Sequence, residues 1–141
     1  MTSQQIALVQ TSFLSVQPIL DTAAGLFYDR LFELDPALRR LFARTDMAQQ
    51  KKILIQTLTV VVKSIDRLDQ LVPAIEALGR RHAGYGVRAE HYETVGAALL
   101  WTLGQGLGDG FTPELEAAWT EAYTTLASVM IGAADGVAVA A

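Results

Sequence analysis

The sequence predicts an all-α protein of about seven or eight helices joined by short loops. Apolar residues recur every three or four positions through most of the chain, the spacing of one face of a helix. No stretch alternates apolar and polar residues in the way a half-buried strand does. Capping residues and prolines also stand where the apolar stripes begin, as they do at helix starts.

The composition narrows the possible functions. The chain has 141 residues, of which 51% are hydrophobic and 18% charged, and its formal net charge is −4. That length fits one domain, and the acidic balance argues against a nucleic acid partner, since phosphate binding needs clustered Lys and Arg. The sequence contains no cysteine, which excludes disulfides, thiolate nucleophiles and cysteine-held iron–sulfur clusters.

The sequence also argues against a membrane partner. No uninterrupted apolar run reaches the ~18 residues of a membrane span, and the N-terminus lacks the pattern of a signal peptide. A cytoplasmic location is therefore the expectation, while the oligomeric state stays open.

The first helix is predicted over about Ser3–Gln17. Thr2 and Gln5 have the spacing of a capping box, in which each residue satisfies a backbone N–H of the other. The buried stripe of this helix comprises Ile6, Val9, Phe13 and Val16.

A second helix is predicted to begin at Pro18 or Asp21 and to end near Leu34. Its apolar face comprises Ala24, Phe27, Leu31 and Leu34, with Tyr28 on the flank of that face. Asp35-Pro36 then reads as a capping residue followed by proline at the first helical position. It predicts a short helix over Ala37–Phe42.

After a loop over Ala43–Asp46, a long helix is predicted to continue to about Ile65. Asp46 and Gln49 resemble a second capping pair. The inward stripe comprises Met47, Gln50, Leu54, Leu58, Val61 and Ile65. Gln50 is the polar member. It either extends its amide toward solvent from the first turn or directs that amide into a pocket as a hydrogen-bond donor.

The next helix, after a polar break at Asp66–Asp69, carries a histidine on its apolar stripe. That stripe comprises Leu71, Ile75, Leu78 and His82. Gly84 and Gly86 predict that the helix ends just past His82. An inward histidine at a helix end either ligates a metal or cofactor, or hydrogen-bonds a nearby carbonyl with its charge favoured by the helix C-terminus.

Two further helices complete the chain. The first is predicted over about Glu90–Leu107, with an inward stripe of Tyr92, Val95, Leu99, Leu103 and Leu107. Thr112-Pro113-Glu114 is a strong start signal for the last one. Its inward stripe comprises Leu115, Trp119, Ala122, Leu126 and Met130. Residues 1–131 are the expected domain, and 132–141 are expected to form a frayed tail.

Three spaced motifs resemble one family. The segments Leu26–Phe32 and Pro36–Phe42 resemble the second helix and following corner of flavohaemoglobin haem domains. Gly79–His82, Gly86-Val87, Tyr92 and Val95-Gly96 look like the proximal segment and next helix of neuroglobin-like globins, and Phe111–Leu115, Ala118-Trp119 and Tyr123 look like their last helix. Because the motifs keep their order over about Ser3–Ile131, the chain is identified as a member of the bacterial single-domain globins of this lineage.

The resemblance implies a haem pocket holding haem b (iron protoporphyrin IX). It assigns His82 as the proximal iron ligand and Tyr28 and Gln50 as the distal pair that contacts the bound gas. Leu54 matches the aliphatic residue over the iron. The other positions that match haem-contacting residues are Phe42, Val87, Tyr92 and Val95.

Three departures from related globins stand out. Vertebrate neuroglobins have a second ligating histidine where this chain has Gln50. The other histidine, His91, is expected to face solvent or a haem-edge carboxylate, so bis-histidine ligation is not expected. Flavohaemoglobins append a reductase module, so this chain is expected to need an external reductase for turnover. Their haem domains also carry a glutamate where this chain has Gly136 beside Asp135.

The family resemblance implies reversible binding of oxygen, and of CO and NO, with slow release because two donors contact the ligand. That favours storage, scavenging or redox chemistry over bulk oxygen delivery. One alternative is an enzyme, a nitric oxide dioxygenase that detoxifies NO with a separate reductase. Another is a haem-based sensor acting through a partner protein.

Overall fold

Helices make up nearly all of the described chain. The computed structural model describes the backbone of residues 1–140 and the side chains of residues 1–134, and it contains no strand in that range. The α-helices are α1 (Ser3–Val16), α2 (Leu20–Leu34), α3 (Met47–Lys63), α4 (Leu68–Gly84), α5 (Ala89–Leu107) and α6 (Pro113–Ala140). Short 3₁₀ helices join some of them: η1 (Gln17–Ile19), η2 (Pro36–Phe42), η3 (Ile65–Arg67) and η4 (Gly108–Gly110). The all-α prediction is confirmed, with six α-helices in this range where seven or eight helices were expected.

Three predicted helix starts have their caps. Thr2 Oγ1 accepts from the backbone N–H of Gln5 at 3.1 Å, and Gln5 Oε1 accepts from that of Thr2 at 3.0 Å. Asp46 Oδ1 accepts from the first N–H groups of α3, and Thr112 Oγ1 accepts at 3.2 Å from the N–H of Leu115. Each cap satisfies donors that the first turn of a helix otherwise leaves without partners.

Two helix boundaries differ from the expectation. The segment after Asp35 is a 3₁₀ helix of seven residues, and Asp35 caps it by accepting from the backbone N–H of Ala37 at 3.2 Å. Residues 132–141 were expected to form a frayed tail, and the backbone of α6 is helical to Ala140. Glycine in a helix costs only about 1 kcal/mol relative to alanine, so Gly132 does not by itself stop a helix in an alanine-rich run. The side chains of Asp135 and Gly136 lie outside the described residues.

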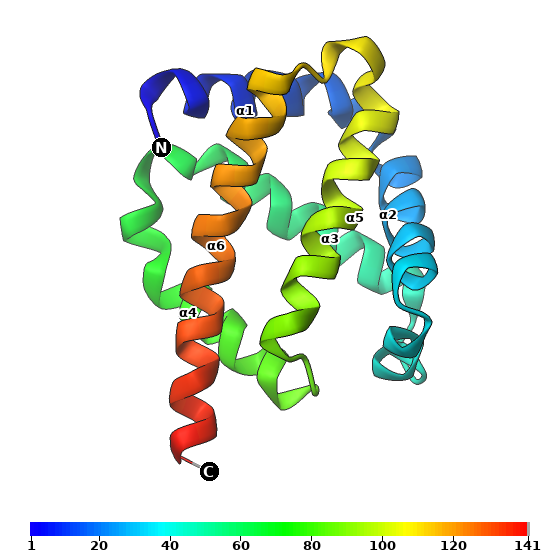
Figure 1. The fold of residues 1–141 in the computed structure, drawn as a ribbon, viewed down its shortest axis with the longest axis vertical. Coiled ribbons are helices and arrows are strands. Elements are labelled where there is room, and N and C mark those ends of the chain that lie inside the picture. The colour runs from blue at the N-terminus through cyan, green and yellow to red at the C-terminus, as the bar shows by residue number, and fades with distance from the viewer. Residues whose placement is uncertain (141) are drawn as a thin grey trace.

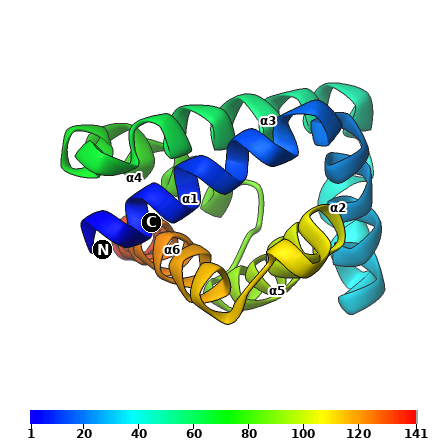
Figure 2. The ribbon, with the colours of Figure 1, turned by 90° about the horizontal axis from the view of Figure 1, so that it is seen from above.

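The long helices lie on two sides of the molecule, with α2 across one end (Figure 1 and Figure 2). In Figure 1, α5 and α6 run along the length of the molecule and α1 crosses one end of them. Seen from above in Figure 2, α3 and α4 run along one side, α5 and α6 along the other, and α2 closes one end between α3 and α5. None of the helices described has the length and apolar character needed to cross a membrane.

The buried side chains form separate clusters. One cluster joins α1 to the end of α5 and the start of α6, around Val9, Phe13 and Trp119. A second joins α2 to η2 and α5, and a third joins α4 to the start of α5 and the second half of α6. A domain of this size usually has one contiguous core. A binding site is therefore expected between the second and third clusters.

Candidate functional site

His82 lies in the last turn of α4, where the local sequence ends the helix. Gly86 has a φ of +94°, a left-handed conformation that glycine adopts without a steric cost. The turn is closed by the backbone N–H of Val87, which donates to the His82 carbonyl at 3.0 Å. The helix therefore ends just past His82, as the two glycines predicted.

The two ring nitrogens of His82 have different surroundings. Nδ1 lies 2.8 Å from the carbonyl oxygen of Leu78, one turn earlier in α4. Burial lowers the pKa of His82, and this outweighs the opposite effect of the Leu78 carbonyl; the Arg81 charge lowers it further. The neutral ring thus donates from Nδ1 to Leu78 and keeps the lone pair of Nε2. Of the two interpretations left open by the sequence, the carbonyl contact is present and it leaves Nε2 able to ligate a metal.

Tyr28 and Gln50 form a hydrogen-bonded pair from different helices. Gln50 Nε2 on α3 donates to Tyr28 Oη on α2 at 3.1 Å. Tyr28, expected on the flank of its helix face, is 4% exposed. Burial raises the pKa of its phenol despite the opposing effect of Gln50. Because Gln50 occupies the phenol oxygen as donor, the phenol proton stays available to donate to a third group.

One cavity of about 220 Å³ brings all the predicted site residues together. They come from α2, η2, α3, α4, the loop after α4, and α5. Tyr28 belongs to the cluster on the α2 side, whereas Leu78, one turn before His82, packs on the cluster beside α6. The Tyr28–Gln50 pair and His82 therefore lie on different walls of the cavity. The predicted residues that line the cavity are Tyr28, Phe42, Gln50, Leu54, His82, Val87, Tyr92 and Val95.

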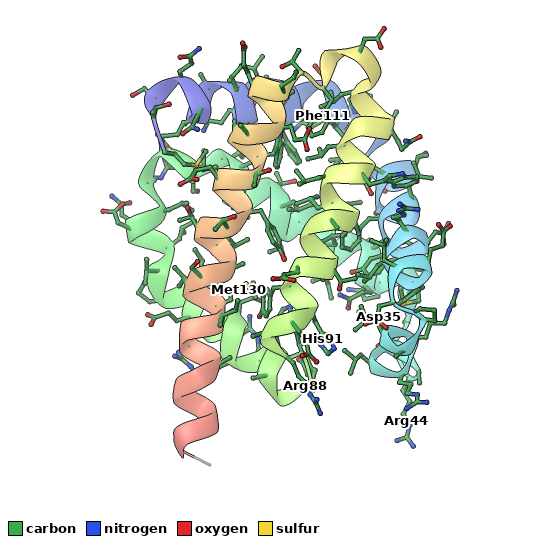
Figure 3. All side chains as sticks on the ribbon, in the orientation of Figure 1. Asp35, Arg44, Arg88, His91, Phe111 and Met130 are labelled. Carbon is green, nitrogen blue, oxygen red and sulfur yellow. The ribbon has the colours of Figure 1, made fainter. Side chains whose placement is uncertain are left out.

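Two side chains at the start of α5 add polar groups to the cavity wall. Tyr92 is buried, and among the described residues its hydroxyl has no hydrogen-bond partner. Burial raises the pKa of that hydroxyl. His91 is half-buried rather than facing solvent, and its Nδ1 accepts from the Arg88 N–H at 2.9 Å. Figure 3 shows His91 and Arg88 together at the end of the molecule where α5 begins.

The sequence analysis missed some of the lining. The site assignment left out Leu78, although its carbonyl is the group that fixes the His82 ring. Its position four residues before His82 is the signal that could have found it, since such residues share a helix face. Leu126, Ala127 and Met130 of α6 also line the cavity. The stripe of α6 included Leu126 and Met130, but the sequence offered no sign that they face a cavity rather than the core.

The donor set and the packing fit an apolar cofactor held through one imidazole nitrogen. The cavity separates two hydrophobic clusters, and the inward residues of α3 line it, so that Val62 is the only buried residue of that helix. Among the described residues, the buried Tyr92 hydroxyl on this wall has no hydrogen-bond partner. An apolar cavity that divides the packed interior, with polar atoms on its wall, fits the binding of an apolar group. These features define an all-helical cofactor-binding protein with an imidazole on one side of its pocket.

A comparison with known protein families identifies the family to which this cofactor-binding protein belongs. The globin family profile matches residues 25–130. The chain therefore belongs to the globin family, and membership implies a haem cofactor, which the imidazole and the apolar pocket fit.

Its relatives include bacterial flavohemoproteins. The chain is 31% identical to the flavohemoprotein of Bacillus subtilis over 132 residues, which is 92% of this chain and 33% of that protein. It is 33% identical to that of Vibrio cholerae over 137 residues, 93% of this chain and 34% of that protein. The chain thus spans about a third of the length of these relatives. It belongs to the same lineage as their haem domains.

Solved structures show the same fold. A carbene transferase engineered from a Rhodothermus marinus protein, named as a nitric oxide dioxygenase, superposes with a TM-score of 0.89 at 30% identity. The superposition covers 99% of this chain and 97% of that one. A bacterial globin from Campylobacter jejuni superposes with a TM-score of 0.83 at 23% identity, covering 96% of this chain and 98% of that one. The second likeness supports the fold alone.

Proposed function

We propose that this globin holds haem b through His82 and binds oxygen reversibly, with Tyr28 and Gln50 as donors to the bound gas. The observation that carries the proposal is the arrangement of the Tyr28–Gln50 pair and His82 around one cavity. Haem, when bound, supplies an iron atom with a coordination position for a diatomic ligand. The side chains of the chain then decide how firmly that ligand is held.

His82 would hold the haem iron through Nε2. The Leu78 carbonyl accepts from Nδ1–H, which fixes the tautomer and the ring orientation and makes Nε2 more basic. The low pKa produced by burial keeps the ring neutral at pH 7. A neutral imidazole is the form that binds a metal. Haem held in this cavity would also contact Phe42, Leu54, Val87, Tyr92 and Val95, which line it together with His82.

The distal pair is arranged to donate. Tyr28 is neutral at pH 7 because burial raises its pKa, so its O–H is present as a donor. Gln50 orients the phenol by donating to its oxygen, and the second N–H of its amide stays free. A hydrogen bond to a ligand carrying negative charge is worth about 1–3 kcal/mol in such a pocket. Two donors therefore predict tight binding with slow release, which suits storage or scavenging.

The test is the oxygen dissociation rate of Tyr28→Phe. Loss of about 1–3 kcal/mol corresponds to a rate about 5- to 150-fold faster, measured by stopped-flow displacement of oxygen with CO. Tyr85→Phe makes the same chemical change at a residue that is 67% exposed, and it should leave the rate unchanged. An unchanged rate in Tyr28→Phe would contradict the role of this residue.

Nitric oxide dioxygenation is the second candidate. It is favoured by the likeness to flavohemoproteins and to the Rhodothermus marinus structure named for that activity. The reaction joins NO and O₂ to give nitrate and consumes one electron, which a reductase has to supply. Tyr28 and Gln50 would hold the oxygen while NO enters. Sustained nitrate production with an added reductase and NADH would support this function, whereas a single turnover per haem would exclude it.

A further inference from the structure

The positive charges of this acidic chain are concentrated in two segments. Residues 39–52 and 80–88 carry eight Lys or Arg and one Asp, a formal charge of +7. All other residues together carry three Lys or Arg and fourteen Asp or Glu, a formal charge of −11. The two parts account for the net charge of −4. The segregation is therefore much larger than the net charge suggests.

The two segments meet at one end of the molecule. A Cβ built on Gly86 would lie 3.3 Å from Leu41 Cδ2, so the loop after α4 contacts η2. In Figure 3, Arg44 and Arg88 lie at the same end of the molecule, although they come from different elements. We call the exposed basic side chains of these segments the basic rim; they are Arg39, Arg40, Arg44, Lys52, Arg80, Arg81 and Arg88. Lys51 is left out because it is half-buried and its Nζ lies against α2 near Gly25.

The basic rim borders the cavity. Leu41, Phe42, His82 and Val87 line the cavity, and each is within two residues of a rim arginine. Among the described residues, no ion pair joins a rim side chain to a carboxylate. The two ion pairs present are formed by Arg30 and Arg67, which are not part of the rim. The nearby carboxylates of Asp35 and Asp46 instead cap η2 and α3. The rim charges are therefore available to an external anion.

We propose that the basic rim docks the acidic face of a protein electron donor beside the cavity. The inference rests on the proposed function, because a donor is required only if the cofactor held by His82 has to be re-reduced. A compact acidic protein contacts the rim while the negative remainder of the surface repels it, so the charge pattern selects one orientation. An extended polyanion, such as an anionic membrane, would also meet the surrounding negative surface. The pattern thus favours a small acidic protein.

The test uses the haem-loaded full chain and a reduced plant-type ferredoxin as the acidic donor. The rate constant of haem reduction is measured by stopped flow against ionic strength, and the affinity by the anisotropy of labelled ferredoxin. Arg44→Glu/Arg88→Glu should lower the rate constant at least about tenfold at low salt, and the wild-type rate should fall as salt rises. Affinity should fall with it, while the haem spectrum stays unchanged.

The matched control is Lys63→Glu/Arg67→Glu, which makes the same change of charge at the far end of α3. Seventeen residues at about 1.5 Å each separate that end from the start of the helix. At an ionic strength of about 0.1 M this control should stay within about twofold of wild type, because exposed charges beyond the Debye length of about 10 Å at that ionic strength are screened. Equal losses in both double variants would overturn the proposal, since only bulk charge would then matter.

Other outcomes also contradict a docking role. A wild-type rate that does not depend on salt would overturn it, and that measurement needs no variant. Loss of haem from Arg44→Glu/Arg88→Glu would show that the rim holds the cofactor instead. Binding of phosphatidylserine vesicles that this variant abolishes, without an effect on ferredoxin, would assign the rim to membranes. Ferredoxin anisotropy does not require haem, so it separates a failure of docking from a failure of the proposed function.

Discussion

Gly79 lies where the helix that carries His82 passes close to the backbone of the last helix. A Cβ built on Gly79 would lie 2.5 Å from the carbonyl oxygen and 2.6 Å from the Cα of Met130. Both are backbone atoms, so they cannot rotate away as the end of a side chain could. Gly79→Ala therefore requires α4 to move away from α6, and His82 follows Gly79 by three residues on the same helix.

The size of the effect follows from two opposing terms. Overpacking a buried contact typically costs about 1–3 kcal/mol, and backbone overlap of this kind belongs at the upper end. The higher helix propensity of alanine returns about 1 kcal/mol. We therefore expect Gly79→Ala to lower the free energy of unfolding by about 2 kcal/mol. Gly84→Ala is the matched control, because no heavy atom lies within 4 Å of its Cβ position in the same helix.

Urea denaturation followed by circular dichroism measures both changes. Gly84→Ala should be as stable as wild type or slightly more stable, while Gly79→Ala should unfold at lower urea with the same slope. Displacement of His82 should also weaken haem retention in Gly79→Ala. A Gly79→Ala variant as stable as Gly84→Ala would show that α4 and α6 separate without cost, contrary to this expectation.

Two further predictions concern hydrogen bonds of α6. Trp119 Nε1 donates to Oγ of the buried Ser12 at 2.9 Å. Ser12→Ala should therefore lower the free energy of unfolding, measured by urea denaturation, by about 1–3 kcal/mol. Ser128→Ala, at an exposed serine, should leave it nearly unchanged. Tyr123 Oη donates to the Tyr92 carbonyl at 2.6 Å, and burial, followed by the charge of Tyr92, raises its pKa. The contribution of this phenol to the stability of the fold is complete below about pH 10, where the phenol of the unfolded chain begins to ionise. That contribution declines as the pH rises further. Tyr123→Phe should reduce that alkaline decline by about 1.4 kcal/mol per pH unit; an identical decline in urea denaturations at pH 9–11 would contradict the assignment.

Much of the fold could be predicted from local sequence signals. The caps at Thr2, Asp46 and Thr112 are short-range chemistry, and each starts a helix as expected. The end of α6 could not be predicted in this way, because Gly132 weakens a helix without forbidding it. The 3₁₀ geometry of η2 could not be predicted either, because the apolar spacing of only seven residues does not distinguish a 3₁₀ helix from an α-helix.

The candidate site was only partly accessible from residue patterns. His82 and Gln50 stood out because each is a polar residue on an apolar stripe. Tyr28 did not, since a tyrosine beside an apolar face is typical of a core, and its role came from the family resemblance. The division of the core into clusters on either side of the cavity depends on the packing of distant helices. So does the unpartnered Tyr92 hydroxyl.

The absorption spectrum of the purified protein shows whether His82 holds the haem. His91 is the only other histidine of the chain and also lines the cavity, so His91→Ala is the matched control for His82→Ala. Spectra of the oxidised, reduced and CO-treated forms should be the same in wild type and His91→Ala. His82→Ala should lose haem or its proximal signature, with partial recovery on adding imidazole. An unchanged spectrum in His82→Ala, or loss of the haem spectrum in His91→Ala instead, would show that His82 does not hold the haem.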